Sequence, residues 1–109
     1  MNSEEKLLDI VIKLTKTKKL IWYINNKFLA KAVLGGRVEF TLGTPIDSLS
    51  GLNVFGSDYY KLTIKHGQEE THIWKKGKNN KLFELYTIVF IDEQKNINEM
   101  FIAEFSKFL

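Results

Sequence analysis

The segment LIWYINNKFLAKAVLGGRVEFTL, residues 20–42, predicts three short β-strands joined by tight turns. Apolar residues recur at every second position, and the expected strands cover residues 20–24, 28–34 and 37–42. Three-residue loops at 25–27 and 34–36 place one apolar set on a common face: Leu20, Trp22, Ile24, Phe28, Ala30, Ala32, Val38, Phe40 and Leu42. Because a slip of one residue exchanges the two faces, this pattern selects the three-residue loops.

The stretch YYKLTIKHGQEETHIWK, residues 59–75, predicts a second hairpin with strands at 59–65 and 69–75. We expect His66 and Gly67 to form its two-residue turn, because both residue types tolerate positive φ. This register pairs Tyr59 with Trp74. It directs Tyr60, Leu62 and Ile64 toward the core and turns a second set away from it: Tyr59, Lys61, Thr63, His72 and Trp74.

Amphipathic helices are expected at both ends of the chain, over residues 4–17, 81–91 and from Asn96 onward. Ser3 is the expected N-cap of the first helix, and Asn79 or Asn80 that of the second. A break at 92–96 and a capping box of Asn96 and Glu99 are expected before the third. Its apolar face would contain Ile97, Met100, Phe101, Phe105 and Phe108.

These elements predict an α+β fold in one domain over residues 1–109. It comprises an N-terminal helix, a five-stranded, mainly antiparallel sheet and one or two C-terminal helices. Residues 43–58 contain the single proline and three glycines, and form either a packed Ω-loop or a functional loop.

The expected strands are apolar on both faces, which is unusual for a small antiparallel sheet. The side chains on the face turned from the core include Ile21, Tyr23, Leu29, Val33, Tyr59 and Trp74. Either a terminal helix covers them, giving three layers, or they form an interface with a protein partner or a second copy of the chain. Both alternatives are open from the sequence.

The sequence shows no motif of a catalytic, metal or cofactor site. The chain has 109 residues, of which 44% are hydrophobic and 27% charged, and it has no cysteine. His66 and His72 are poorly spaced for a metal site, which needs three protein ligands in its catalytic form. No nucleophile elbow or phosphate loop is present. We therefore expect a protein that is not an enzyme and uses no cofactor or metal, and that lies in the cytoplasm, because no signal peptide or membrane span is visible.

The net charge of +3 is unevenly distributed, since residues 1–81 carry +6 and residues 82–109 carry −3. Fifteen of the sixteen basic residues are lysine, which argues against sequence-specific nucleic-acid binding, so a nucleic-acid partner is unlikely on this evidence. One stretch could bind an anion at a helix N-terminus beside an aromatic ring, unless it is a solvated loop. It consists of Trp74, Lys75, Lys76, Lys78, Asn79, Asn80 and Lys81.

Four short segments resemble a loose group of small uncharacterised proteins of bacteria and their phages. They are Lys19-Leu20-Ile21-Trp22, the Gly35-Gly36 turn, Tyr59-Tyr60-Lys61-Leu62-Thr63 and Leu82-Phe83-Glu84-Leu85-Tyr86. The resemblance implies a helix, antiparallel sheet, helix layout and no functional residues. The segment 43–58 is longer than the connection expected from the group, and is a candidate for a function particular to this chain.

The most direct hypothesis is a small protein-binding module that acts as a homo-oligomer, an inhibitor or an adaptor. The first alternative is a phage or bacterial protein that sequesters an anionic nucleotide, and the second is weak association with nucleic acid. No membrane partner is expected.

Overall fold

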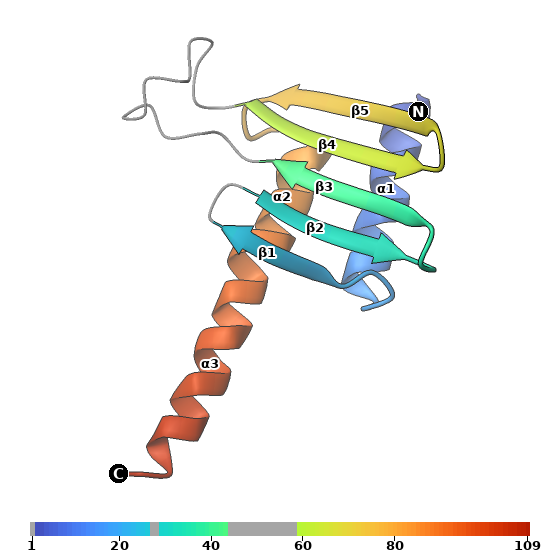
Figure 1. The fold of residues 1–109 in the computed structure, drawn as a ribbon. Helices are drawn as coiled ribbons and strands as arrows, with labels where there is room; N and C mark the ends of the chain where they lie inside the picture. The colour runs from blue at the N-terminus through green and yellow to red at the C-terminus, as the bar shows by residue number, and fades with distance from the viewer. Residues whose placement is uncertain (1, 27–28, 44–58) are drawn as a thin grey trace.

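The computed structural model describes residues 2–26, 29–43 and 59–109, and it has the expected α+β layout (Figure 1). Five antiparallel strands form one sheet in the order β1-β2-β3-β4-β5. The elements are α1 Ser3–Lys16, β1 Trp22–Asn26, β2 Leu29–Leu34, β3 Val38–Gly43, β4 Tyr59–His66, β5 Glu69–Lys76, α2 Lys81–Tyr86, η2 Thr87–Asp92 and α3 Glu93–Ser106. The segment expected to be irregular at 43–58 lies outside the described residues, apart from Gly43 at the end of β3.

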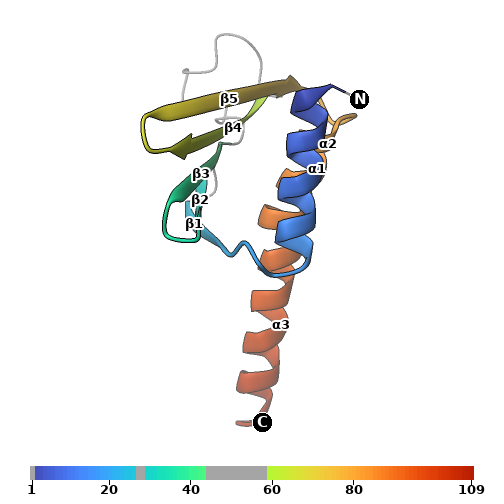
Figure 2. The ribbon, with the colours of Figure 1, turned by 90° about the vertical axis from the view of Figure 1, so that its right-hand side faces the viewer.

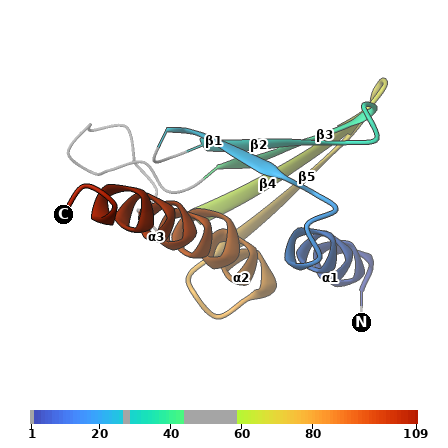
Figure 3. The same cartoon turned by 90° about the horizontal axis from the view of Figure 1, so that it is seen from below.

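Both helical segments lie on the same side of the sheet, which gives two layers (Figures 2 and 3). Leu8 and Val11 of α1 and Leu82 and Leu85 of α2 are all buried against the inner face of the sheet. We call the opposite face, turned away from the helices, the outer face. No described helix covers it, so of the two alternatives left open by the sequence, the one in which a terminal helix completes a third layer is wrong.

Each strand contributes side chains to the core between the sheet and the helices. Trp22, from β1, is buried and packs edge-on against Phe40 of β3. Its Nε1 donates a hydrogen bond of 3.0 Å to Oγ1 of Thr15, which in turn donates to the carbonyl oxygen of Val11 at 2.8 Å. The two buried polar side chains of α1 and β1 therefore satisfy each other, as burial requires.

The predicted faces of the described strands are confirmed, but the predicted turns are wrong. Asn26 pairs with Leu29, so the loop expected at 25–27 is not formed, and Leu34 pairs with Val38, so the loop expected at 34–36 lies at 35–37.

The hairpin of β4 and β5 also turns one residue later than expected. His66 pairs with Glu69, so the turn consists of Gly67 and Gln68. Gly67 has a φ of +64° at the first turn position, which is the position that glycine takes in a type II′ hairpin. Tyr59 consequently lies opposite Lys76 and not Trp74. A register shift of two residues preserves the face of every side chain, because strands alternate with a period of two.

Two predictions about the helices are wrong. Asn2, not Ser3, caps α1, because its side-chain oxygen accepts from the backbone N–H of Glu5 at 2.8 Å. The expected break at 92–96 is absent, since η2 connects α2 to α3 without interruption (Figure 1). A π-helical turn holds one extra residue, which rotates the residues that follow it around the helix axis. The spacing of the apolar residues therefore changes at this point although the helix itself continues.

Candidate binding surfaces

Polar side chains occupy the middle of the outer face. Thr41 on β3 pairs in register with Thr63 on β4, and Gly43 pairs with Lys61. The apolar residues of the predicted interface lie to either side: Tyr23, Leu29 and Val33 on β1 and β2, with Ile21 just before β1, and Tyr59 and Trp74 on β4 and β5. The six side chains thus form two separate groups and not one continuous apolar surface.

Each exposed aromatic ring of the outer face lies directly opposite a lysine on the neighbouring strand. The register pairs are Tyr23 with Lys31, Tyr59 with Lys76 and Trp74 with Lys61. The ammonium group of Lys61 lies 4.6 Å from the centre of the Trp74 ring, and that of Lys76 lies 5.6 Å from the Tyr59 ring. Both distances are within the range of cation–π attraction.

His72 is held on the same face by side-chain contacts to its neighbours. Its Nδ1 lies 3.0 Å from Oγ1 of Thr63, its register partner, and its Nε2 lies 3.4 Å from a carboxylate oxygen of Glu70. His66, at the end of β4, does not join it, so the two histidines do not form a pair of ligands.

The structure does not bring the seven residues of the predicted anion site together. Trp74 and Lys76 point to the outer face, whereas Lys75 points to the helix side and its ammonium lies 3.5 Å from a carboxylate oxygen of Glu4. Lys78 and Asn79 are exposed in the connection. The alternation of β5 explains this division, because neighbouring residues of a strand point to opposite faces.

The N-terminus of α2 is occupied by its own cap. Oδ1 of Asn80 accepts from the backbone N–H of Phe83 at 2.9 Å, and its Nδ2 donates to the carbonyl oxygen of Gly77 at 3.0 Å. Asn80 thus uses one of the backbone N–H groups that an anion would need.

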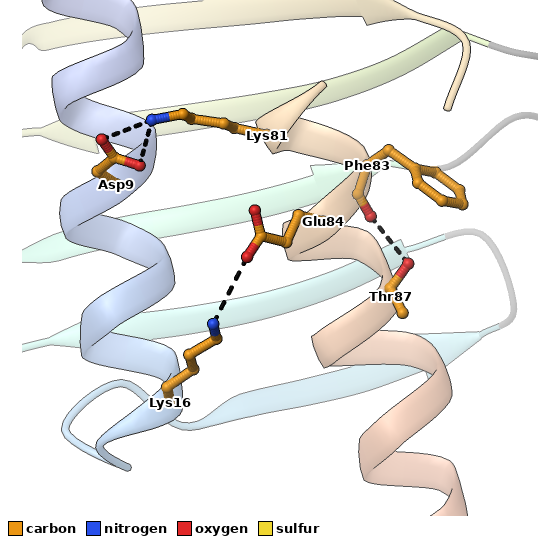
Figure 4. Close-up of polar contacts among 6 residues, drawn as sticks. All are labelled: Asp9, Lys16, Lys81, Phe83, Glu84 and Thr87. Carbon is orange, nitrogen blue, oxygen red and sulfur yellow. Dashed lines mark hydrogen bonds and ion pairs between the residues drawn. The ribbon is translucent and has the colours of Figure 1, made fainter. Parts of the chain in front are cut away.

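Lys81 is also engaged, because its ammonium group lies between the two carboxylate oxygens of Asp9 on α1, at 2.6 and 2.7 Å (Figure 4). The hydrogen bond with Asp9 raises the pKa of Lys81 above its usual 10.5, and burial opposes that rise. A second pair joins the same two helices one to two turns further along, where Lys16 lies 3.5 Å from Glu84 (Figure 4). Both lysines therefore link α1 to α2 through carboxylates.

Helix α3 extends beyond the β1 edge of the sheet (Figures 1 and 2). Its described side chains are all exposed, and four large apolar ones on one side of the helix form what we call the α3 stripe: Ile97, Phe101, Ile102 and Phe105. Met100 is also exposed, but it points away from Ile102. Phe101 and Phe105 stack on each other with ring centres 5.6 Å apart. A shallow hollow on the helix surface is lined by Asn98, Phe101, Ile102 and Phe105.

The spacing of these four lining residues is i, i+3, i+4 and i+7. Four residues on one helix in this arrangement form the hole that receives a side-chain knob from a facing helix in knobs-into-holes packing. The hollow on α3 is therefore suited to an apolar side chain of another helix.

Other kinds of site find no support in the described part of the chain. Residues 2–26, 29–43 and 59–109 contain no cluster of three or more histidine, aspartate or glutamate side chains able to hold a metal ion. Within the same ranges, no helix has the length and apolar character needed to cross a membrane. Comparison with protein-family models, curated proteins and solved structures gave no match.

The sequence analysis named the exposed rings and placed Lys61 on their face, but it did not pair Lys61 with Trp74 and it missed Lys31. The alternation of side chains along the strands already assigns Lys31 and Lys61 to the outer face, so the sequence indicated that they lie near the rings. The pairing of Lys76 with Tyr59 could not be found, because it depends on the exact turn at Gly67. In α3, Ile102 was missed because it lies at the side of the expected stripe.

Proposed function

We propose that the protein is a non-enzymatic protein-binding module that associates with a second copy of itself through α3. The supporting observation is the α3 stripe, in which Phe105 is 62% exposed and Phe101 is 48% exposed. Large apolar side chains that gather on one exposed face commonly mark an association surface. Their burial between two copies would be favourable, at about 25 cal/mol for each Å² removed from water.

The shape of the hollow favours a helix as the partner, and α3 of a second copy supplies one with suitable knobs. A twofold contact uses the same patch on both subunits, so Phe101 or Phe105 of one copy can enter the hollow on the other. Helix α3 projects past the sheet, so a second copy could approach its free end at a distance from the strands (Figure 1).

Sedimentation equilibrium over a range of concentrations tests this proposal. The wild-type chain should approach twice the monomer mass of 12.7 kDa, whereas Phe105→Glu should remain a monomer. Ala103→Glu is the matched control, because it adds the same charge to the same helix away from the hollow, and it should associate like the wild type. A wild-type monomer at high concentration, or a Phe105→Glu variant that associates normally, would count against this role.

A further inference from the structure

The outer face combines exposed aromatic rings with an excess of positive charge. Tyr23 is 68% exposed and Trp74 57% exposed. Among the residues that the structure describes, four lysines share the face with two glutamates: Lys31, Lys61, Lys65 and Lys76 against Glu39 and Glu70. Glu39 and Glu70 both lie beside Lys65 in the register, so the remaining three lysines are the ones placed opposite rings. Positive charge and aromatic surface therefore coincide.

We propose that the outer face binds single-stranded nucleic acid without sequence preference. Bases would stack on Trp74, Tyr59 and Tyr23, while Lys61, Lys76 and Lys31 would neutralise the phosphates. Stacking on aromatic side chains tolerates any base because every base has a π-face, and a basic surface follows the backbone. This proposal uses a different surface from the association through α3 and does not depend on it.

The repeated register pairing of ring and lysine is the observation that carries the proposal. Lys61 and Lys76 lie over their rings in the free protein, at 4.6 and 5.6 Å. Because a lysine side chain is flexible, a base that stacks on the ring can displace the ammonium group. The ammonium group would then lie beside the base, close to the phosphate of the same nucleotide. In each pair, the aromatic ring would thus stack on a base and the lysine would contact the phosphate backbone.

The layout of the face fits a polymer better than a free nucleotide. The pair Tyr23 and Lys31 lies at the β1 edge, and the pair Trp74 and Lys61 lies at the β5 edge. Four strand spacings of about 4.8 Å separate the two edge strands by about 19 Å, which is more than one nucleotide can span. A single strand crossing the sheet would contact both edges and add their contributions.

The same layout argues against a protein as the occupant. The centre of a protein interface is its most apolar part, with charged residues depleted. Here the centre contains Thr41, Thr63 and Lys61, while the apolar side chains lie to either side of it. The scarcity of arginine, which argues against reading of base edges, is compatible with stacking that ignores base identity.

Fluorescence anisotropy with labelled oligo-dT and oligo-dA of about 16 nucleotides tests the proposal. Both should bind at about 50 mM salt, and log K should fall linearly with log salt, by about 0.7 for each phosphate contact. Intrinsic fluorescence gives a second signal, because Trp74 is exposed and Trp22, the other tryptophan, is buried. Stacking should quench the Trp74 component.

Variants separate stacking from general charge attraction. Trp74→Ala should weaken binding at least about fivefold, whereas Trp74→Phe should retain most of it. Lys61→Ala should weaken binding and reduce the salt slope by about 0.7. Lys6→Ala, which removes an exposed lysine from α1 on the helix side, should leave both unchanged. The melting temperature of each variant checks that the fold is intact.

Three results would overturn the proposal. The first is absence of oligonucleotide binding at low salt. This outcome includes the case in which the outer face instead binds a protein, and Trp74→Ala abolishes that binding. The second is equal weakening by Lys61→Ala and Lys6→Ala, which indicates attraction without a site. The third is equal affinity for duplex and single strand, since paired bases cannot stack on the rings.

Discussion

The ammonium group of Lys81 contacts both carboxylate oxygens of Asp9, at 2.6 and 2.7 Å, and so joins the first residue of α2 to the middle of α1. The two residues are 72 positions apart in the chain. Together with Lys16 and Glu84, this pair links the two helices where they lie side by side against the sheet (Figure 4). Of these two pairs, only that of Lys16 and Glu84 joins the basic part of the chain, residues 1–81, to the acidic part, residues 82–109, because Asp9 and Lys81 both belong to the basic part.

Replacement of Lys81 by methionine should lower the free energy of unfolding at neutral pH, and the loss should disappear at high pH. The folded pKa of Lys81 lies above its unfolded value of 10.5, so its contribution is complete below pH 10.5 and is lost as the pH rises through the folded pKa. Urea unfolding of wild type and Lys81→Met across this range measures the difference. Lys6→Met serves as the control, and a difference that persists unchanged above the folded pKa would disprove the assignment.

The assignment of side chains to the two faces of the sheet could be predicted because it depends only on parity. The turn at Gly67 and Gln68 shifted the register of β4 and β5 by two residues, yet Tyr60 and Leu62 stayed in the core. The partner of Tyr59 was wrong for the same reason, since pairing depends on the exact turn position. Alternation is therefore a firmer guide to burial than to contacts.

The local sequence could not show whether the lysines of the predicted anion site are available to a ligand, because the carboxylates that pair with them are distant in the chain. Lys75 pairs with Glu4 and Lys81 with Asp9, and both carboxylates belong to α1. Nothing near residues 75–81 indicates that α1 will lie beside them. The packing side of α1 was equally undetermined, because both faces of the expected sheet were apolar enough to receive a helix.

The hydrogen bond from Trp22 to Thr15 should be essential to the core. Thr15→Val keeps the shape of the side chain but leaves the buried indole N–H without an acceptor, which should cost about 1–3 kcal/mol of unfolding free energy. Urea denaturation measures this loss. Thr17→Val is the matched control. The hydroxyl of Thr17 donates to the carbonyl oxygen of Lys13 as that of Thr15 donates to Val11, but it is exposed, so its loss should change stability by less than about 0.5 kcal/mol.

A double-mutant cycle with Trp22→Phe separates this bond from the packing of the ring. Trp22→Phe removes the donor, so Thr15→Val should cost less in that background than in the wild type. Equal costs of Thr15→Val in the two backgrounds would show that the indole N–H does not depend on Thr15.

Asn80 should stabilise the start of α2, whereas its neighbour Asn79 should not. The side chain of Asn80 accepts from the N–H of Phe83 and donates to the carbonyl of Gly77, while Asn79 is exposed and caps nothing in the described structure. Asn80→Ala should therefore lower the unfolding free energy by about 1 kcal/mol, the usual cost of losing an N-cap. Asn79→Ala, the matched control, should lie within about 0.5 kcal/mol of wild type. Thermal and urea unfolding of the two variants decide the matter, and a larger loss in Asn79→Ala would place the cap one residue earlier than the structure does.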